Sequence, residues 1–97
     1  MPWSTPHHYS FDSQTINQYA PDRSGVYGLF TAEQWVYISE SDDIQRSLLA
    51  HLYGDNECIR RLTPSGFVFE MCPPSQRVSR QQALMQEYQP LCNRQTG

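Results

Sequence analysis

Residues 24–39 read SGVYGLFTAEQWVYIS. Two short runs of β-branched and aromatic residues, 25–30 and 35–38, flank a polar turn at 31–34. Such side chains suit the pleated, half-buried surface of a sheet, so each run is typical of a short strand. The sequence therefore predicts a β-hairpin over residues 25–38.

A helix is predicted directly after the hairpin, at about residues 42–53. Ser41 and the two aspartates that follow it offer an N-cap and two acids for the first turn, where the helix dipole favours negative charge. Apolar residues recur every four positions from Ile44 to Leu52, which places them on one helix face. Gly54 is positioned to end this helix.

The remainder of the chain predicts a loop, a strand and a second helix. Residues 54–65 have the composition of a polar loop, and residues 66–72 that of a strand that ends at two consecutive prolines. A last helix is expected at about 76–88, before Pro90. The order ββαβα predicts an α+β fold with a small, three-stranded, mostly antiparallel sheet flanked by helices.

The 97 residues suffice for one hydrophobic core. We expect an N-terminal leader at 1–23, rich in proline and polar residues, and one domain at 24–97. No run approaches the roughly 18 to 20 apolar residues that span a bilayer. The first residues also lack the pattern of a secretory signal, so we expect a cytoplasmic chain with no membrane partner.

The cysteines and histidines give little sign of a metal site. The three cysteines are an odd number and form no C-x-x-C pair, which favours buried free thiols over a disulfide or metal ligands. The adjacent His7 and His8 are expected to lie in a solvated tail.

The charge is unevenly distributed along the chain. The net charge is −3, yet residues 58–97 carry five arginines against two glutamates. Every basic residue other than histidine is an arginine, which favours forked contacts to carboxylate or phosphate. The C-terminal part is therefore a candidate for phosphate binding, although ordinary surface ion pairs explain the same composition.

An ordered set of motifs over residues 24–93 resembles the GIY-YIG nuclease family. GVY at 25–27 is followed by YIS at 37–39, by a helix that carries His51, and by a terminal segment that contains Asn93. The resemblance implies a small sheet that supports phosphodiester hydrolysis with a divalent metal. It assigns Tyr27 and Tyr37 to the motif tyrosines, His51 to the helix base and Asn93 to the terminal asparagine.

Three positions depart from the family pattern. The second motif ends in Ser39 instead of glycine, the helix arginine is replaced by Ser47, and the metal-binding glutamate is replaced by Gln81. Arg46 is a poor substitute, since it lies about 140° around the helix from His51, whereas position 47 lies about 40° away. The loss of one preorganised donor to a developing oxyanion costs about 10² to 10³ in rate. An impaired or inactive site without a metal cofactor is therefore expected.

Two acids, Glu70 and Glu87, are candidate substitutes for the lost metal ligand. Glu70 lies on the last predicted strand and is expected on the opposite face of the sheet. Glu87 is expected to face solvent or Arg80. Each is interpreted as an ordinary surface acid.

These observations leave three hypotheses on function. The first is a non-catalytic domain that binds DNA, RNA or a protein through the vestigial cleft. The second is an active small endonuclease that requires Mg²⁺ or Mn²⁺, and the third is a structural or oligomerising protein whose aromatic leader covers a neighbour. A structural role is the alternative to a functional one for Tyr27 and Tyr37, which could form a cross-strand aromatic pair that packs the sheet. The predicted phosphate contacts of the first hypothesis are Arg46, Arg60, Arg61, Arg77 and Arg80.

Overall fold

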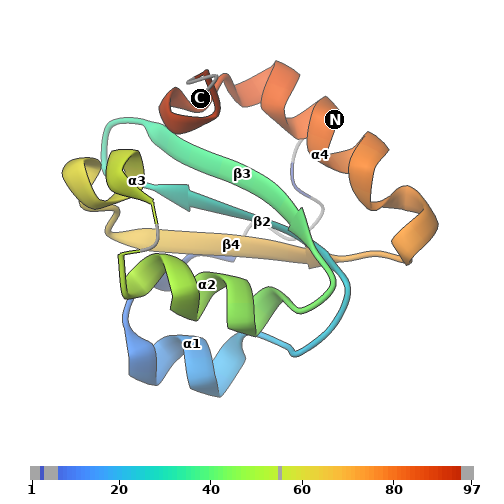
Figure 1. Cartoon of the computed structure of the whole chain (residues 1–97), viewed down its shortest axis with the longest axis horizontal. Coiled ribbons are helices and arrows are strands. Elements are labelled where there is room, and N and C mark those ends of the chain that lie inside the picture. Colours follow the sequence, from blue (N-terminus) through green and yellow to red (C-terminus); the bar gives the residue numbers. More distant parts are fainter. Residues whose placement is uncertain (1–2, 4–6, 55, 95–97) are drawn as a thin grey trace.

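A four-stranded antiparallel sheet forms the centre of the molecule (Figure 1). The computed structural model describes Trp3 and residues 7–54 and 56–94. The strands lie in the order β1-β4-β2-β3. Their bounds are β1 Tyr9–Ser10, β2 Gly25–Phe30, β3 Trp35–Ser41 and β4 Gly66–Met71. The predicted α+β class is confirmed, but the sheet has four strands where three were predicted.

The additional strand comes from the predicted leader. Tyr9 pairs with Phe67 and Ser10 with Gly66, so β1 covers the outer edge of β4. The sequence gives no strand signal there, because two residues are too few for an alternating pattern. The predicted hairpin is present as β2 and β3, and β3 continues three residues beyond its expected end at Ile38.

Helices cover both faces of the sheet, with α1 and α2 on one side and α4 on the other (Figure 1). The α-helices are α1 Ser13–Tyr19, α2 Ile44–Leu52, α3 Glu57–Leu62 and α4 Arg77–Tyr88. Two 3₁₀ helices, η1 Pro74–Gln76 and η2 Leu91–Arg94, flank α4. As predicted, the last helix ends before Pro90, where Gln89 adopts a left-handed conformation. Val78, the second residue of α4, is 54% exposed.

Alternating residues of the central strands supply two cores. One core lies under α1, α2 and α3, and the other lies under α4. Burial of each aliphatic side chain stabilises the fold by about 1.5–3 kcal/mol. Ile16 and Ala20 belong to the first core, so the described part of the leader packs with the domain. The boundary at residue 24 itself stays a prediction. The fully buried members of the first core include Ile16, Leu29, Ile44, Leu48, Ile59 and Phe67, and those of the second include Val26, Ile38, Val68 and Leu84.

Local capping shifts two of the predicted boundaries. The α2 helix begins at Ile44, because Asp43 is its N-cap and accepts a hydrogen bond from the Arg46 amide at 3.0 Å. The two aspartates therefore precede the first turn instead of lying in it. Residues 54–65 were predicted as a loop, but Asn56 caps the short helix α3 through a 3.1 Å hydrogen bond from the Ile59 amide. Burial of Ile59 then anchors this helix to the first core.

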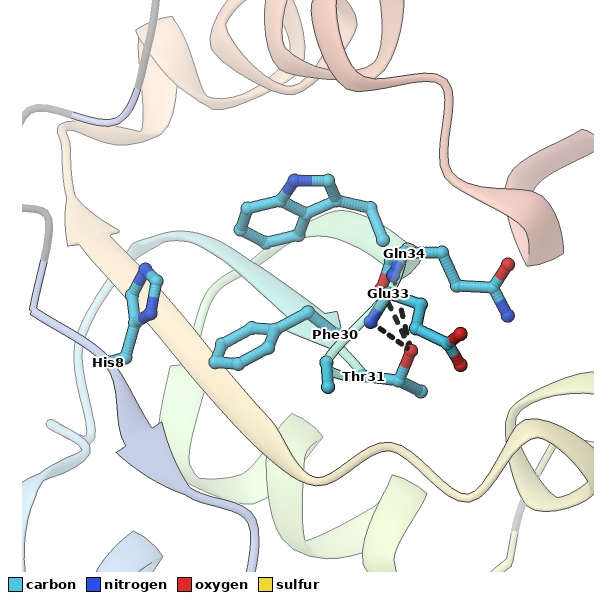
Figure 2. Close-up of a pocket in the computed structure, with 7 residues that line it drawn as sticks. His8, Phe30, Thr31, Glu33 and Gln34 are labelled. Carbon is cyan, nitrogen blue, oxygen red and sulfur yellow. Dashed lines mark hydrogen bonds between the residues drawn. The ribbon is translucent and has the colours of Figure 1, made fainter.

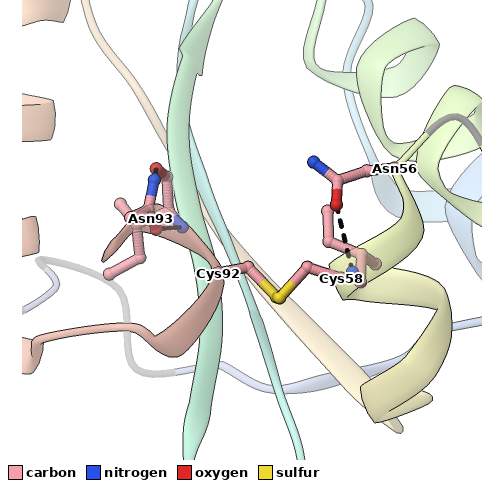
Figure 3. Close-up of a disulfide and its surroundings, with 6 residues drawn as sticks. Asn56, Cys58, Cys92 and Asn93 are labelled. Carbon is pink, nitrogen blue, oxygen red and sulfur yellow. Dashed lines mark hydrogen bonds between the residues drawn. A yellow bond between two sulfur atoms is a disulfide. The ribbon is translucent and has the colours of Figure 1, made fainter. Parts of the chain in front are cut away.

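A disulfide joins Cys58 of α3 to Cys92 of η2 (Figure 3). Both elements lie against β3, which brings two cysteines 34 residues apart in sequence to a Cα–Cα distance of 5.7 Å. The prediction of three free thiols is therefore wrong for this pair, and Cys72 alone is free. No helix of the described residues is long and apolar enough to cross a membrane. The cytoplasmic location stays a prediction. A disulfide favours an oxidising compartment instead, because disulfides persist there.

Candidate functional site

Tyr27, Tyr37 and His51 form a cluster on the α2 face of the sheet. The Tyr27 hydroxyl lies 2.6 Å from Nε2 of His51. The ring of His51 lies 5.5 Å from that of Tyr27 and 5.1 Å from that of Tyr37, between centroids. Tyr27 is only 3% exposed, whereas the imidazole is half-buried. The structure therefore brings together the three aromatic residues that the motif pattern singles out.

Strand register and core packing set this geometry. Tyr27 is opposite Ser39 and Leu29 is opposite Tyr37, so the two tyrosines are diagonal neighbours on one face of the hairpin. Their ring centroids are 6.4 Å apart. On α2, Ile44 and Leu48 are fully buried and fix the rotation of the helix that carries His51. The short contact between phenol and imidazole is a geometry that can transfer a proton.

The two charged positions of the motif pattern are occupied by neutral side chains that bind β3. The Ser47 hydroxyl lies 2.6 Å from the hydroxyl of Ser41, which is buried. Oε1 of Gln81 accepts a 2.8 Å hydrogen bond from the main-chain amide of Glu40. Ser47 and Gln81 thus attach to consecutive residues of β3, and neither contributes a charge to the cluster.

Ser39 causes no backbone strain at the third departure from the pattern. In the part of the chain that the structure describes, Thr63 and Gln89 are the non-glycine residues with positive φ. Ser39 therefore keeps ordinary strand geometry, and its hydroxyl donates to the carbonyl oxygen of Glu40 at 3.3 Å. The side chain still adds bulk where the motif has none.

Asn93 binds the main chain of β3 through both atoms of its amide. Its Oδ1 accepts from the Ile38 amide at 2.7 Å, and its Nδ2 donates to the Ile38 carbonyl at 2.8 Å. Together with Gln81, it satisfies main-chain groups along the outer edge of the last strand of the sheet. Such groups would otherwise be open to pairing with another chain. Asn93 therefore has a clear structural role at this edge.

Four of the five arginines predicted to contact phosphate lie beside carboxylates. Arg46 pairs with Asp42 at 3.1 Å, and Arg61 pairs with Glu57 at 3.5 Å. Both pairs are largely exposed and contribute little to stability. The fifth, Arg60, lies near His51 and is considered below. The phosphate-binding roles of all five arginines stay predictions.

The other two pairs are partly buried and link α4 to the sheet. Arg80 forms two hydrogen bonds with Glu70, at 2.6 and 2.9 Å, and this pairing raises the pKa of Arg80. Nε of Arg77 lies 3.0 Å from Oε1 of Glu40, which is close enough for an ion pair, although its N–H is not aimed for a hydrogen bond. These carboxylates therefore already have cationic partners.

The residue at the metal-ligand position of the motif pattern, Gln81, and the strand acid Glu70 do not fit the divalent metal that this pattern implies. Hard cations such as Mg²⁺ prefer carboxylate oxygens. Gln81 offers a neutral amide oxygen that already accepts a hydrogen bond, and Glu70 binds Arg80. Among the described residues, no group of three or more His, Cys, Asp or Glu side chains is arranged to hold a metal ion.

A pocket of about 240 Å³ lies at the tip of the β2–β3 hairpin (Figure 2). The Thr31 hydroxyl accepts hydrogen bonds from the Glu33 and Gln34 amides, which fixes the turn. His8, expected in a solvated tail, is exposed but packs its ring 4.7 Å from that of Phe30. Glu33 lines this pocket and disfavours a phosphate ligand there.

Comparison with solved structures identifies the same fold in a nuclease domain. The chain is similar to the magnesium-bound GIY-YIG N-terminal endonuclease domain of UvrC from Thermotoga maritima, with a TM-score of 0.67, 18% identity, and coverage of 77% of this chain and 91% of that one. A tyrosine-to-phenylalanine variant of that domain, bound to its catalytic divalent cation, has a TM-score of 0.70, 19% identity and coverage of 82% and 96%. No family model and no curated protein matches the sequence. The likeness confirms the GIY-YIG nuclease-like fold that the motifs predict.

Proposed function

We propose that the chain is a catalytically impaired GIY-YIG nuclease-like domain that binds nucleic acid through the face formed by Tyr27, Tyr37 and His51. The observation that carries this proposal is the environment of Ser47 and Gln81. Both side chains are neutral, and both are engaged with β3. The cluster retains a phenol–imidazole pair but lacks the charged groups that phosphodiester hydrolysis requires.

The chemistry of the remaining residues supports binding more than turnover. The 2.6 Å contact between Tyr27 and His51 can hold or move a proton near a bound water or phosphate. Hydrolysis also needs positive charge where negative charge develops on the phosphoryl oxygens. Each lost donor of that kind costs about 10² to 10³ in rate, and the losses within one catalytic unit are not additive.

A plasmid nicking assay tests the catalytic part of this proposal. Wild-type protein is expected to show no nicking above background in Mg²⁺ or Mn²⁺. The double variant Ser47→Arg/Gln81→Glu is expected to gain metal-dependent nicking, and a further Tyr27→Phe change should remove the gain. Strong nicking by wild-type protein that is abolished by Tyr27→Phe would show that the domain is an active endonuclease.

That active endonuclease is the second candidate function, and the direct contact between the Tyr27 hydroxyl and His51 supports it. A binding assay tests the other part of the first candidate function, the affinity for nucleic acid. The affinity of wild-type protein for labelled single- and double-stranded DNA and RNA should fall steeply with salt, since released counterions drive phosphate binding. Absence of binding to every one of these nucleic acids would contradict the proposed function.

A further inference from the structure

A second pocket lies beside His51, between the C-terminal end of α2 and helix α3. Its volume is about 220 Å³. Its polar lining comes from His51, Arg60 and Thr63, and its apolar lining includes Phe11, Leu52 and Ile59. Tyr27 contacts the same imidazole at 2.6 Å, so His51 belongs both to this pocket and to the aromatic cluster.

Arg60 is the cation of this pocket, and its side chain passes close to Gly54. A Cβ atom added to Gly54 would lie 3.0 Å from Cδ of Arg60 and 4.0 Å from its Nη1. The aliphatic part of the arginine therefore lies directly over Gly54, the second residue after α2. Gly54 also has a φ of 87°, a conformation that side-chain-bearing residues rarely adopt. A glycine at this position therefore leaves room for the Arg60 side chain to pass close to the main chain.

Arg60 also differs from the other predicted phosphate-binding arginines. Within the described part of the chain, no carboxylate lies at ion-pair distance from its guanidinium, whereas the four others have such partners. Glu57, the acid nearest to it on α3, pairs with Arg61. The guanidinium of Arg60 lines the pocket, and its forked donors match the oxygens of a phosphate group.

The size of the pocket restricts what it can hold. Sites for drug-sized ligands measure about 300–1,000 Å³. A pocket of about 220 Å³ is below that range and suits one phosphate group with part of its sugar. Its apolar walls, Phe11, Leu52 and Ile59, can cover the sugar, while the cationic side meets the phosphate.

We infer that Arg60 and His51 form a phosphate subsite for nucleic acid, in which the α3 guanidinium takes the place of the one that position 47 lacks. This inference rests on the proposed function, because it names the group of the nucleic acid that the pocket receives. The phosphate is either an internal phosphodiester or a terminal phosphomonoester. The subsite binds and positions the strand, and no bond is formed or broken.

Matched arginine variants test the subsite. Arg60→Gln is expected to weaken binding of the preferred oligonucleotide about tenfold and to lower the salt slope by about 1. Arg23→Gln removes the same charge at the opposite end of α2, where the carbonyl oxygen of Arg23 accepts a hydrogen bond from the Ile44 amide. This control should keep the wild-type affinity and slope. Equal losses in both variants, or no loss in Arg60→Gln, would overturn the subsite while the proposed function stands.

Two further measurements complete the test. They distinguish an internal phosphodiester from a terminal phosphate, and they separate a failure of the subsite from a failure of the proposed function. An oligonucleotide with a 5′-phosphate and one without it should bind equally if the subsite holds a phosphodiester, and the phosphorylated one should bind more tightly if it holds a terminal phosphate. Inorganic phosphate at constant ionic strength should shift the side-chain NMR signals of His51 in wild-type protein but not in Arg60→Gln. Identical shifts in both proteins would refute the subsite. No binding of any nucleic acid by wild-type protein would refute the proposed function instead.

Discussion

Reduction of the Cys58–Cys92 disulfide is expected to lower the free energy of unfolding by about 4 kcal/mol. The bond closes a loop with a sequence separation of 34 residues. Chain-entropy estimates give about 3 kcal/mol for a 15-residue loop and about 4.7 kcal/mol for a 100-residue loop, so a loop of this length falls between them. For a domain of this size, each kcal/mol changes the melting temperature by roughly 4–8 °C, which predicts a decrease of roughly 15–30 °C.

Thermal unfolding followed by circular dichroism, with and without a phosphine reductant, measures this effect. The double variant Cys58→Ser/Cys92→Ser should melt at the temperature of the reduced wild-type protein and should not respond to reductant. Cys72→Ser is the matched control and should keep the full response, because Cys72 is a free thiol. Equal melting temperatures for oxidised and reduced wild-type protein would refute the reasoning. Titration of three free thiols in denatured, unreduced protein would refute the disulfide itself.

Substitutions at three further positions test the local hydrogen bonds. Asn93→Ala removes both contacts with the main chain of Ile38 and should lower the free energy of unfolding in urea by about 1–3 kcal/mol. Asn93→Asp should not restore this stability, because its second carboxylate oxygen would face the Ile38 carbonyl oxygen. Asn56→Ala removes the α3 N-cap and should cost about 1 kcal/mol by the same assay, with Asn56→Asp close to wild type. The Thr15 amide lowers the pKa of Asp12 at the N-cap of α1. Its stabilisation is therefore present above about pH 4 and is lost as the pH falls through the folded pKa, and Asp12→Asn should flatten this acid dependence in the urea midpoint.

The elements that could be predicted from the sequence are those with strong local signals. The β2–β3 hairpin has two runs of strand-forming residues around a polar turn, and α2 has a four-residue apolar repeat with Gly54 behind it. The motif residues Tyr27, Tyr37 and His51 could be placed near one another because the hairpin register and the helix repeat fix their positions. The prediction that these three side chains lie together therefore needed both the local sequence pattern and the resemblance to a known fold.

The elements that were missed depend on tertiary partners. The strand β1 is two residues long and exists because β4 offers it a free edge. Helix α3 is six residues long, too short for a reliable periodic signal, and it is held by the Asn56 cap and by Cys58. The pairing of Cys58 with Cys92 could not be deduced from an odd number of cysteines, since only the fold brings α3 and η2 to the same strand.

The pocket beside His51 was missed for a related reason. Arg60 was predicted to contact phosphate only from the basic composition of residues 58–97. Its proximity to His51 requires α3, which was expected to be loop, and the close approach of the arginine to Gly54. A glycine that ends one helix a few residues before an arginine is too common a pattern to indicate a binding site by itself.

From the contacts of Ser47 and Gln81 we expect the fold to tolerate other residue types at these two positions. A glutamate at position 81 can accept the same hydrogen bond from the Glu40 amide as Oε1 of Gln81 does. An arginine at position 47 would lose the contact with Ser41, but the Ser41 hydroxyl also accepts from the Asp43 amide at 2.9 Å and donates to the Asp43 carbonyl at 2.8 Å. The turn between β3 and α2 therefore keeps its own hydrogen bonds in the restored variant. A failure of Ser47→Arg/Gln81→Glu to cleave DNA while remaining folded would then locate the defect in the rest of the cleft, and not in these two positions.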